Sequence, residues 1–100
     1  MAANFQIVTH RNHDNLHIKL SGDFDGDSAH TLLAHLKRMC LGTSKVFIHT
    51  SALKHLHPFG LSVFCKNLDF MKRLSIRVML TGENASQLFP EKNKSISILN

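Results

Sequence analysis

The hydrophobic pattern is most regular in the second half of the segment from His55 to Leu74. Apolar side chains recur there every three or four residues, the spacing of one helical face: Leu61, Phe64, Cys65, Leu68 and Met71. Pro58 suits the first turn of such a helix, because an N–H at that position has no partner within the helix. Gly60 lets backbone or a partner approach closely. The pattern predicts one helix that begins at about Pro58 and ends near Leu74.

Alternating or short apolar runs predict five strands: residues 5–9, 16–20, 45–49, 75–80 and, at the edge of the sheet, 96–99. The linker between the first two strands is polar and rich in turn-forming residues, which indicates a hairpin. The apolar run of the third strand is typical of a buried strand.

Two further helices complete the predicted elements. An apolar stripe predicts a helix from about Ser28 to Cys40, with Asp27 or Ser28 as its N-cap. Residues 84–89 predict a short helix that ends before Pro90. The resulting order, β-β-α-β-α-β-α-β, is that of an α/β domain with helices packed on a mixed sheet.

Composition limits the class of protein. The chain has 100 residues and 43% apolar side chains, enough for one core. It has no apolar run near the roughly 20 residues that span a bilayer, and no basic segment followed by an apolar one at its start. Cys40 and Cys65 fall on apolar helix faces, which indicates reduced, packed thiols. We expect a cytoplasmic protein without membrane insertion.

The net charge of +5 raises the question of nucleic-acid binding. The lysines and arginines are scattered along the chain, however, and only two pairs are adjacent: Lys37–Arg38 and Lys72–Arg73. Both pairs lie near predicted helix C-termini, where cations interact favourably with the helix dipole. The sequence shows no basic stripe with an aromatic platform, so it predicts a solvated surface and no nucleic-acid partner.

Catalytic patterns are missing from the sequence. It contains no recognisable nucleophile with a neighbouring base, and no glycine-rich phosphate loop. We therefore expect a protein that is not an enzyme and that needs no cofactor.

Three segments, taken in order, resemble the STAS domain, the module of bacterial anti-sigma factor antagonists and of sulphate-transporter tails: LHIKLSGDFDGDSAHTLLAHL, KVFIHTSALKHLHPFGLSVF and SIRVMLTGEN. The likeness extends roughly from Phe5 to Phe89. It implies a single STAS-like domain over residues 1–100, with a mixed four- to five-stranded sheet and helices packed mainly on one face.

The chain departs from the family at the phosphorylation motif. Family antagonists have Asp-Ser-Ser/Thr-Gly-Leu before the second helix, and the first serine is phosphorylated by a partner kinase. Gly60 and Leu61 match this motif, whereas His57 replaces the acid and Pro58 replaces the phosphorylated serine. His49 replaces a second acid at the end of the third strand. The resemblance thus implies a domain without the family's switch at Pro58.

The resemblance implies a non-catalytic regulatory domain that binds a partner protein. Expected partners are an anti-sigma factor with serine-kinase activity or the ATPase of an ABC transporter. A homodimer is a further possibility. We expect the partner to contact the residues around the predicted helix start: His55, His57, Pro58, Phe59, Gly60, Leu61 and Ser62. Phe59 is the expected hot spot, because aromatic anchors often dominate interfaces.

The histidines favour an alternative function, a sensor domain that binds a metal or an anion. His49, His55 and His57 are candidate metal ligands if they converge at the end of the third strand. His57 at a helix N-terminus also suits an anion, which free backbone N–H groups would bind.

Overall fold

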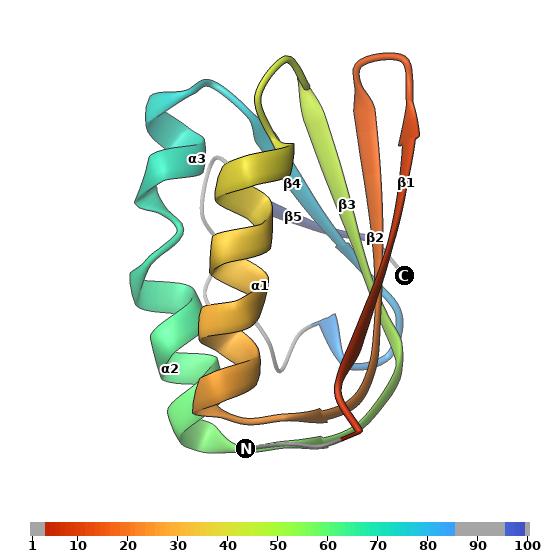
Figure 1. Ribbon diagram of the computed structural model, residues 1–100, viewed down its shortest axis with the longest axis vertical. Coiled ribbons are helices and arrows are strands. Elements are labelled where there is room, and N and C mark those ends of the chain that lie inside the picture. Colours follow the sequence, from red (N-terminus) through yellow and green to blue (C-terminus); the bar gives the residue numbers. More distant parts are fainter. Residues whose placement is uncertain (1–3, 86–95, 100) are drawn as a thin grey trace.

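The computed structural model describes residues 4–85 and, for their backbone, residues 96–99. The elements follow one another as two strands, a helix, a long strand, two helices and two strands (Figure 1): β1 Gln6–Asn12, β2 Asn15–Phe24, α1 Gly26–Met39, β3 Lys45–Leu56, α2 Pro58–Lys66, α3 Asp69–Arg73, β4 Arg77–Thr81 and β5 Ile96–Leu99.

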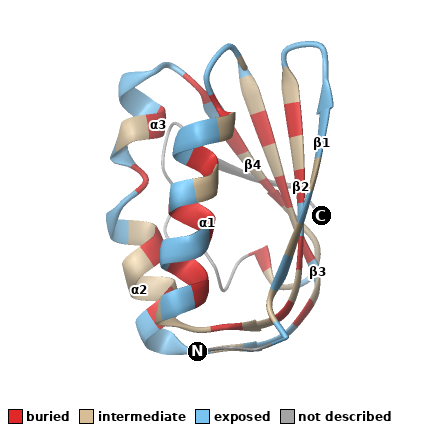
Figure 2. Cartoon of the chain, viewed as in Figure 1, coloured by how far each residue is buried: buried red, intermediate tan, exposed pale blue. Residues whose placement is uncertain are grey.

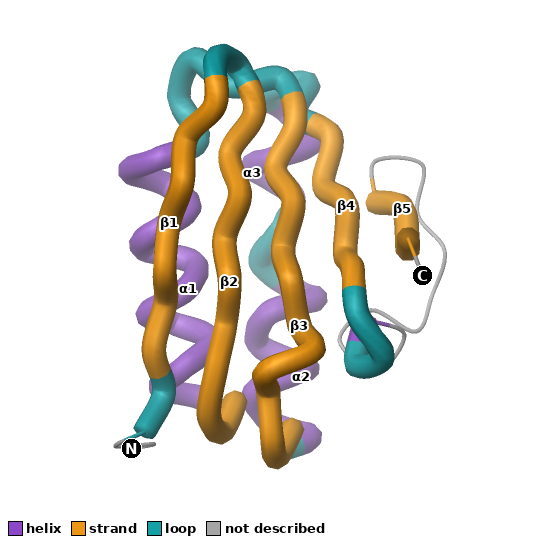
Figure 3. The backbone as a smooth tube through the Cα atoms, turned by 90° about the vertical axis from the view of Figure 1, so that its right-hand side faces the viewer, coloured by secondary structure: helices purple, strands orange, loops and turns teal. Residues whose placement is uncertain are grey.

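The five strands form one mixed sheet in the order β1-β2-β3-β4-β5. Strands β1 and β2 pair antiparallel as the predicted hairpin, and the other neighbours pair parallel. Helices α1, α2 and α3 form a second layer behind the sheet (Figure 3). The mixed sheet, the hairpin, the edge position of β5 and the placement of the described helices on one face were all predicted correctly.

The core lies between the sheet and this helical layer (Figure 2). Alternate residues of β2 point into it, so Leu16, Ile18 and Leu20 are fully buried while their neighbours are not. Helix α1 contributes the predicted stripe, which includes Leu32 and Leu36. Sequence periodicity alone therefore assigns the buried face of both layers.

The predicted helix from residue 58 to residue 74 is in fact two helices, so that prediction was wrong. The chain leaves helical geometry at Asn67, whose side-chain Nδ2 donates a 2.7 Å hydrogen bond to the carbonyl of Val63. Such local bonds compete with the helical ladder at asparagine. The apolar stripe survives the break, because Phe64, Leu68 and Met71 are all buried.

The predicted boundaries were also wrong around the first helix. Strand β2 extends to Phe24, where a loop was expected, and α1 begins at Gly26. Its N-cap is Asp25, not Asp27 or Ser28, because the Asp25 carboxylate accepts the Ser28 N–H at 2.8 Å.

Strand β3 is much longer than predicted. It runs for 12 residues to Leu56, so the segment expected to be a connecting loop is an extended part of the sheet. Its pairing with β2 shifts register twice on the way.

The helix predicted for residues 84–89 lies mostly outside the described residues. Among the described residues, no helix is long and apolar enough to cross a membrane.

Candidate functional site

The predicted site lies where two helices begin at the same end of the molecule (Figure 1). Helix α1 starts after Asp25, and α2 starts after His57, in the extended segments that leave β2 and β3. The His57 N–H donates a 2.9 Å hydrogen bond to the carbonyl of Phe24, which ties the two strand ends together. The sheet thus fixes the two helix starts next to each other.

Gly60 brings the first turn of α2 into backbone contact with Asp25. A Cβ atom at Gly60 would lie 2.5 Å from the Asp25 carbonyl oxygen, far inside van der Waals contact. The sequence prediction that Gly60 permits a close approach is therefore correct. The neighbouring element in this contact is the α1 N-cap.

Phe59 is the largest apolar side chain on this surface, with 69% of its area exposed. One part of its ring lies against the first residue of α1, since a Cβ at Gly26 would lie 2.6 Å from Phe59 Cδ2. The ring is thus supported by α1 on one side and open to solvent on the other. An aromatic anchor that is already held loses little conformational entropy when it binds.

The remaining predicted residues surround Phe59 in different ways. Pro58 is the first residue of α2 and is exposed, as are His55 and His57. Leu61 and Ser62 are half-buried, and Leu61 packs against the core. The structure therefore places the predicted partner-binding residues on or directly under one surface.

The charges of this surface are mixed. The Ser28 N–H holds the pKa of the Asp25 carboxyl below its usual value, and His57 acts in the same direction. Asp23 lies opposite His55 in the register of β2 and β3, and its buried Oδ1 has no hydrogen-bond partner among the described residues. Acids and imidazoles alternate here, so charge alone selects neither an anion nor a cation.

His49 does not join His55 and His57. It is bonded through Nε2 to Nδ1 of His17, 3.1 Å away, and through Nδ1 to the hydroxyl of Thr81. Burial lowers the pKa of His49, and the charges of His17 and Lys19 lower it further. Within residues 4–85, no three histidine, cysteine or acidic side chains gather as metal ligands would. The condition for a metal site shared by His49, His55 and His57, that the three converge, is therefore not met among the described residues.

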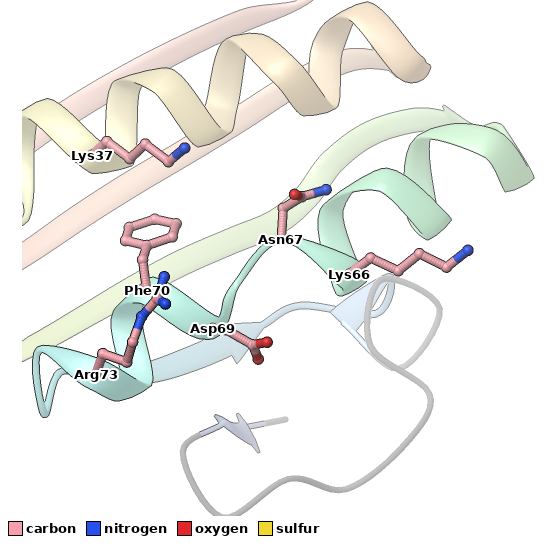
Figure 4. A pocket seen from close by; sticks show the side chains of 6 residues that line it. All are labelled: Lys37, Lys66, Asn67, Asp69, Phe70 and Arg73. Carbon is pink, nitrogen blue, oxygen red and sulfur yellow. The ribbon is translucent and has the colours of Figure 1, made fainter.

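A hollow of about 270 Å³ opens elsewhere, between α1 and the α2–α3 connection (Figure 4). Its lining is mostly polar: Lys37, Lys66, Asn67, Asp69, Phe70 and Arg73. The Lys37 ammonium lies 5.5 Å from the centre of the Phe70 ring, a cation–π distance. The hollow lies beside the helix break at Asn67, and none of its lining residues belongs to the first turn of α2.

Sequence reasoning missed Gly26, which makes room for Phe59, and His17, which binds His49. These contacts join residues far apart in the chain, and neither has a local sequence signal.

Known structures share this fold. The anti-sigma factor antagonist SpoIIAA in its unphosphorylated form matches with a TM-score of 0.70 at 12% identity, over 96% of this chain and 87% of that one. The phosphorylated form of SpoIIAA, a Bacillus cell fate determinant, gives 0.67 at 12% identity over 96% and 91%. A Shewanella loihica protein of the DUF3478 family, described as having a SpoIIAA-like fold, gives 0.62 at 17% identity over 100% and 91%.

Sequence comparison is more selective. No curated protein matches the chain. The model of the STAS domain family matches residues 5–86, which is most of this chain. The three segments that suggested this family lie in that range, on β2 and α1, on β3 and α2, and on β4. The chain belongs to the STAS domain family.

Proposed function

We propose that the chain is a non-catalytic protein-interaction domain of the anti-sigma factor antagonist type, which docks through the start of α2. Its partner is a protein such as an anti-sigma factor with serine-kinase activity or a transporter ATPase. Binding is not switched by phosphorylation at Pro58.

The exposed Phe59 ring, held against Gly26, is the observation that carries this proposal. Interface energy is usually concentrated in a few aromatic or arginine side chains near the centre of the contact. Phe59 lies in the first turn of α2 beside the start of α1, and so it offers an anchor that α1 supports on one side, with polar groups around it.

The absence of a switch rests on the residue at the helix start. Phosphorylation adds nearly two negative charges, which act strongly at a helix N-terminus. Pro58 has no hydroxyl to modify, and between His55 and Ser62 the only hydroxyl belongs to Ser62, which is half-buried. SpoIIAA, which has the same fold, exists in unphosphorylated and phosphorylated forms.

The test begins with the proteins that co-purify with the tagged chain from its native cells. With a purified partner, Phe59→Asp should weaken binding by about 30-fold or more, as measured by calorimetry. Leu41→Asp is the matched control, because Leu41 is 63% exposed and lies in the turn after α1, at the other end of that helix. Equal binding by both variants and the wild type would place the interface elsewhere.

The second part of the proposal needs a partner with kinase activity. ATP should leave the wild-type complex intact and add no phosphate to residues 55–62. Pro58→Ser restores a hydroxyl at the first helical position, and its complex should dissociate with ATP. Phosphate on Ser62 of the wild type, with release of the partner, would show that the switch has moved.

A further inference from the structure

Among the described side chains, those on the sheet face opposite the helices come from four strands, β1 to β4. In the part where all four pair, three rows cross the sheet: from Asn12 to Arg77, from His10 to Met79, and from Val8 to Thr81. We call these rows the open sheet patch. Among the described residues, no helix lies over it (Figure 3).

The patch is basic although the cations are scattered in the sequence. Pairing brings Lys19, Lys45 and Arg77 onto it from three different strands, and Lys19 and Arg77 are exposed. None of its residues is acidic; Asp14 and Asp23 lie beyond it at the two ends of β2. The scattering of cations along the sequence, which argued against a nucleic-acid partner, therefore does not hold in the folded sheet.

Aromatic rings lie at the centre of the patch. His17 stacks on Phe47 with ring centres 4.6 Å apart and planes 6° apart. The His17 and His49 rings are also parallel, with planes 5° apart, ring centres 5.4 Å apart and 3.1 Å between His17 Nδ1 and His49 Nε2. These three half-buried rings thus form a parallel, pre-ordered set on the two central strands.

We infer that the open sheet patch binds single-stranded nucleic acid, with bases extending the stack formed by His17, Phe47 and His49 and with phosphates on Lys19, Lys45 and Arg77. Stacking on aromatic side chains between cations is how sheet surfaces hold single strands. Four strands span roughly 14 Å, room for the two or three bases that such a sheet stacks.

Other anionic partners fit the patch less well. A membrane surface would need protruding apolar side chains, yet Phe47 and Met79 are half-buried and only Val8 is largely exposed. An acidic peptide would use the cations and leave the central rings without a role. A duplex keeps its bases stacked internally, and a flat sheet face does not enter its grooves.

Fluorescence anisotropy with labelled RNA and DNA of about ten nucleotides tests this inference at roughly 50 and 200 mM salt. Lys19→Glu and Arg77→Glu should each weaken binding about ten-fold and reduce the salt dependence. Lys72→Glu makes the same charge change in α3, on the helical layer, and should have a much smaller effect. Equal losses of affinity in all three variants would show that binding depends only on the net charge of the protein, and would contradict a binding site on the open sheet patch.

Phe47→Leu tests the stacking separately from the charge. Affinity should fall about five-fold or more with an unchanged salt dependence, and melting temperature shows whether the variant is folded. Unaltered affinity, or equally tight binding of duplex, would contradict stacking. Vesicles that contain anionic lipid are the competing ligand. If they bind the chain in a way that depends on Lys19, and oligonucleotides do not bind, the ligand of the patch is a membrane surface and the inference is wrong. Phe59→Asp should leave oligonucleotide binding unchanged, which separates this result from that of the proposed partner site.

Discussion

Gly60 and Asp25 touch through their backbones, because a Cβ at Gly60 would lie 2.5 Å from the Asp25 carbonyl oxygen. The first turn of α2 therefore rests on the residue that caps α1. Neither backbone can move without displacing a helix start, so this contact fixes the geometry beneath Phe59.

Gly60→Ala should lower the unfolding free energy by about 1–3 kcal/mol, as overpacking of a tight contact does. Urea denaturation measures the change. Gly26→Ala is the matched control, because its Cβ would meet only the Phe59 side chain, which can turn into solvent. We expect it to alter stability by less than about 1 kcal/mol, while partner binding weakens. Equal destabilisation by both would show that the ring is as fixed as the backbone.

Stability should decrease on mild acidification because of two histidines. Burial lowers the pKa of His35 and of His49 below the usual 6.5, and nearby cations add to this: Arg38 for His35, and His17 and Lys19 for His49. The unfolded chain then binds protons first as the pH falls. The stability that the two neutral histidines contribute is fully present above about pH 6.5, the pKa in the unfolded chain. It is lost as the pH falls toward their lower pKa values in the folded protein.

Urea midpoints at several pH values between about 7.5 and 5 measure this slope. His35→Gln together with His49→Gln should flatten it. His30→Gln is the control, since His30 is an exposed residue of α1. If the unfolding free energy of the doubly substituted protein still falls with pH as steeply as that of the wild type, other groups cause the pH dependence.

Asn84 should matter more than its position in a turn suggests. Its amide donates to the carbonyls of Thr50 and Leu53, at 2.9 and 3.2 Å, where β3 continues past β4. Asn84→Ala removes both bonds and should cost roughly 1–3 kcal/mol in the unfolding free energy. Asn67→Ala removes one exposed amide–carbonyl bond to Val63 and should cost less. The reverse order would mean that water replaces Asn84.

The two cysteines should differ in reactivity. Burial raises the pKa of the Cys40 thiol and removes it from solvent, whereas Cys65 is half-buried. The thiolate is the reactive form, so iodoacetamide should modify Cys65 before Cys40 in the folded protein. Mass spectrometry of peptides at successive times shows the order, and urea should make both sites react. Faster labelling of Cys40 in the native state would require α1 to open at its C-terminus.

Local pattern was enough to predict the layers of this fold. Leu16, Ile18 and Leu20 alternate, and the stripe of α1 has helical spacing, so their buried faces follow from the sequence. The full length of β3 did not follow, because its second half carries polar residues such as Ser51 and Lys54 that are exposed at the end of the sheet. The break at Asn67 was hidden because the apolar spacing continues across it.

The candidate site was predictable only where it depends on neighbours in the chain. Pro58 and Gly60 indicated a helix start with a close contact, and both indications were correct. The support of Phe59 by Gly26 and the pairing of His17 with His49 depend on tertiary structure. Residues joined in this way carry no common signal until the strands and helices are paired.

The contact between Phe59 and Gly26 has a consequence for how the protein can diverge. Any side chain at position 26 would occupy the space of the ring, so position 26 cannot gain a side chain while the Phe59 ring keeps its present place. Homologues with a larger residue at position 26 should have a small or differently placed residue at position 59. Covariation of this pair would then distinguish family members that keep the aromatic anchor from those that have lost it.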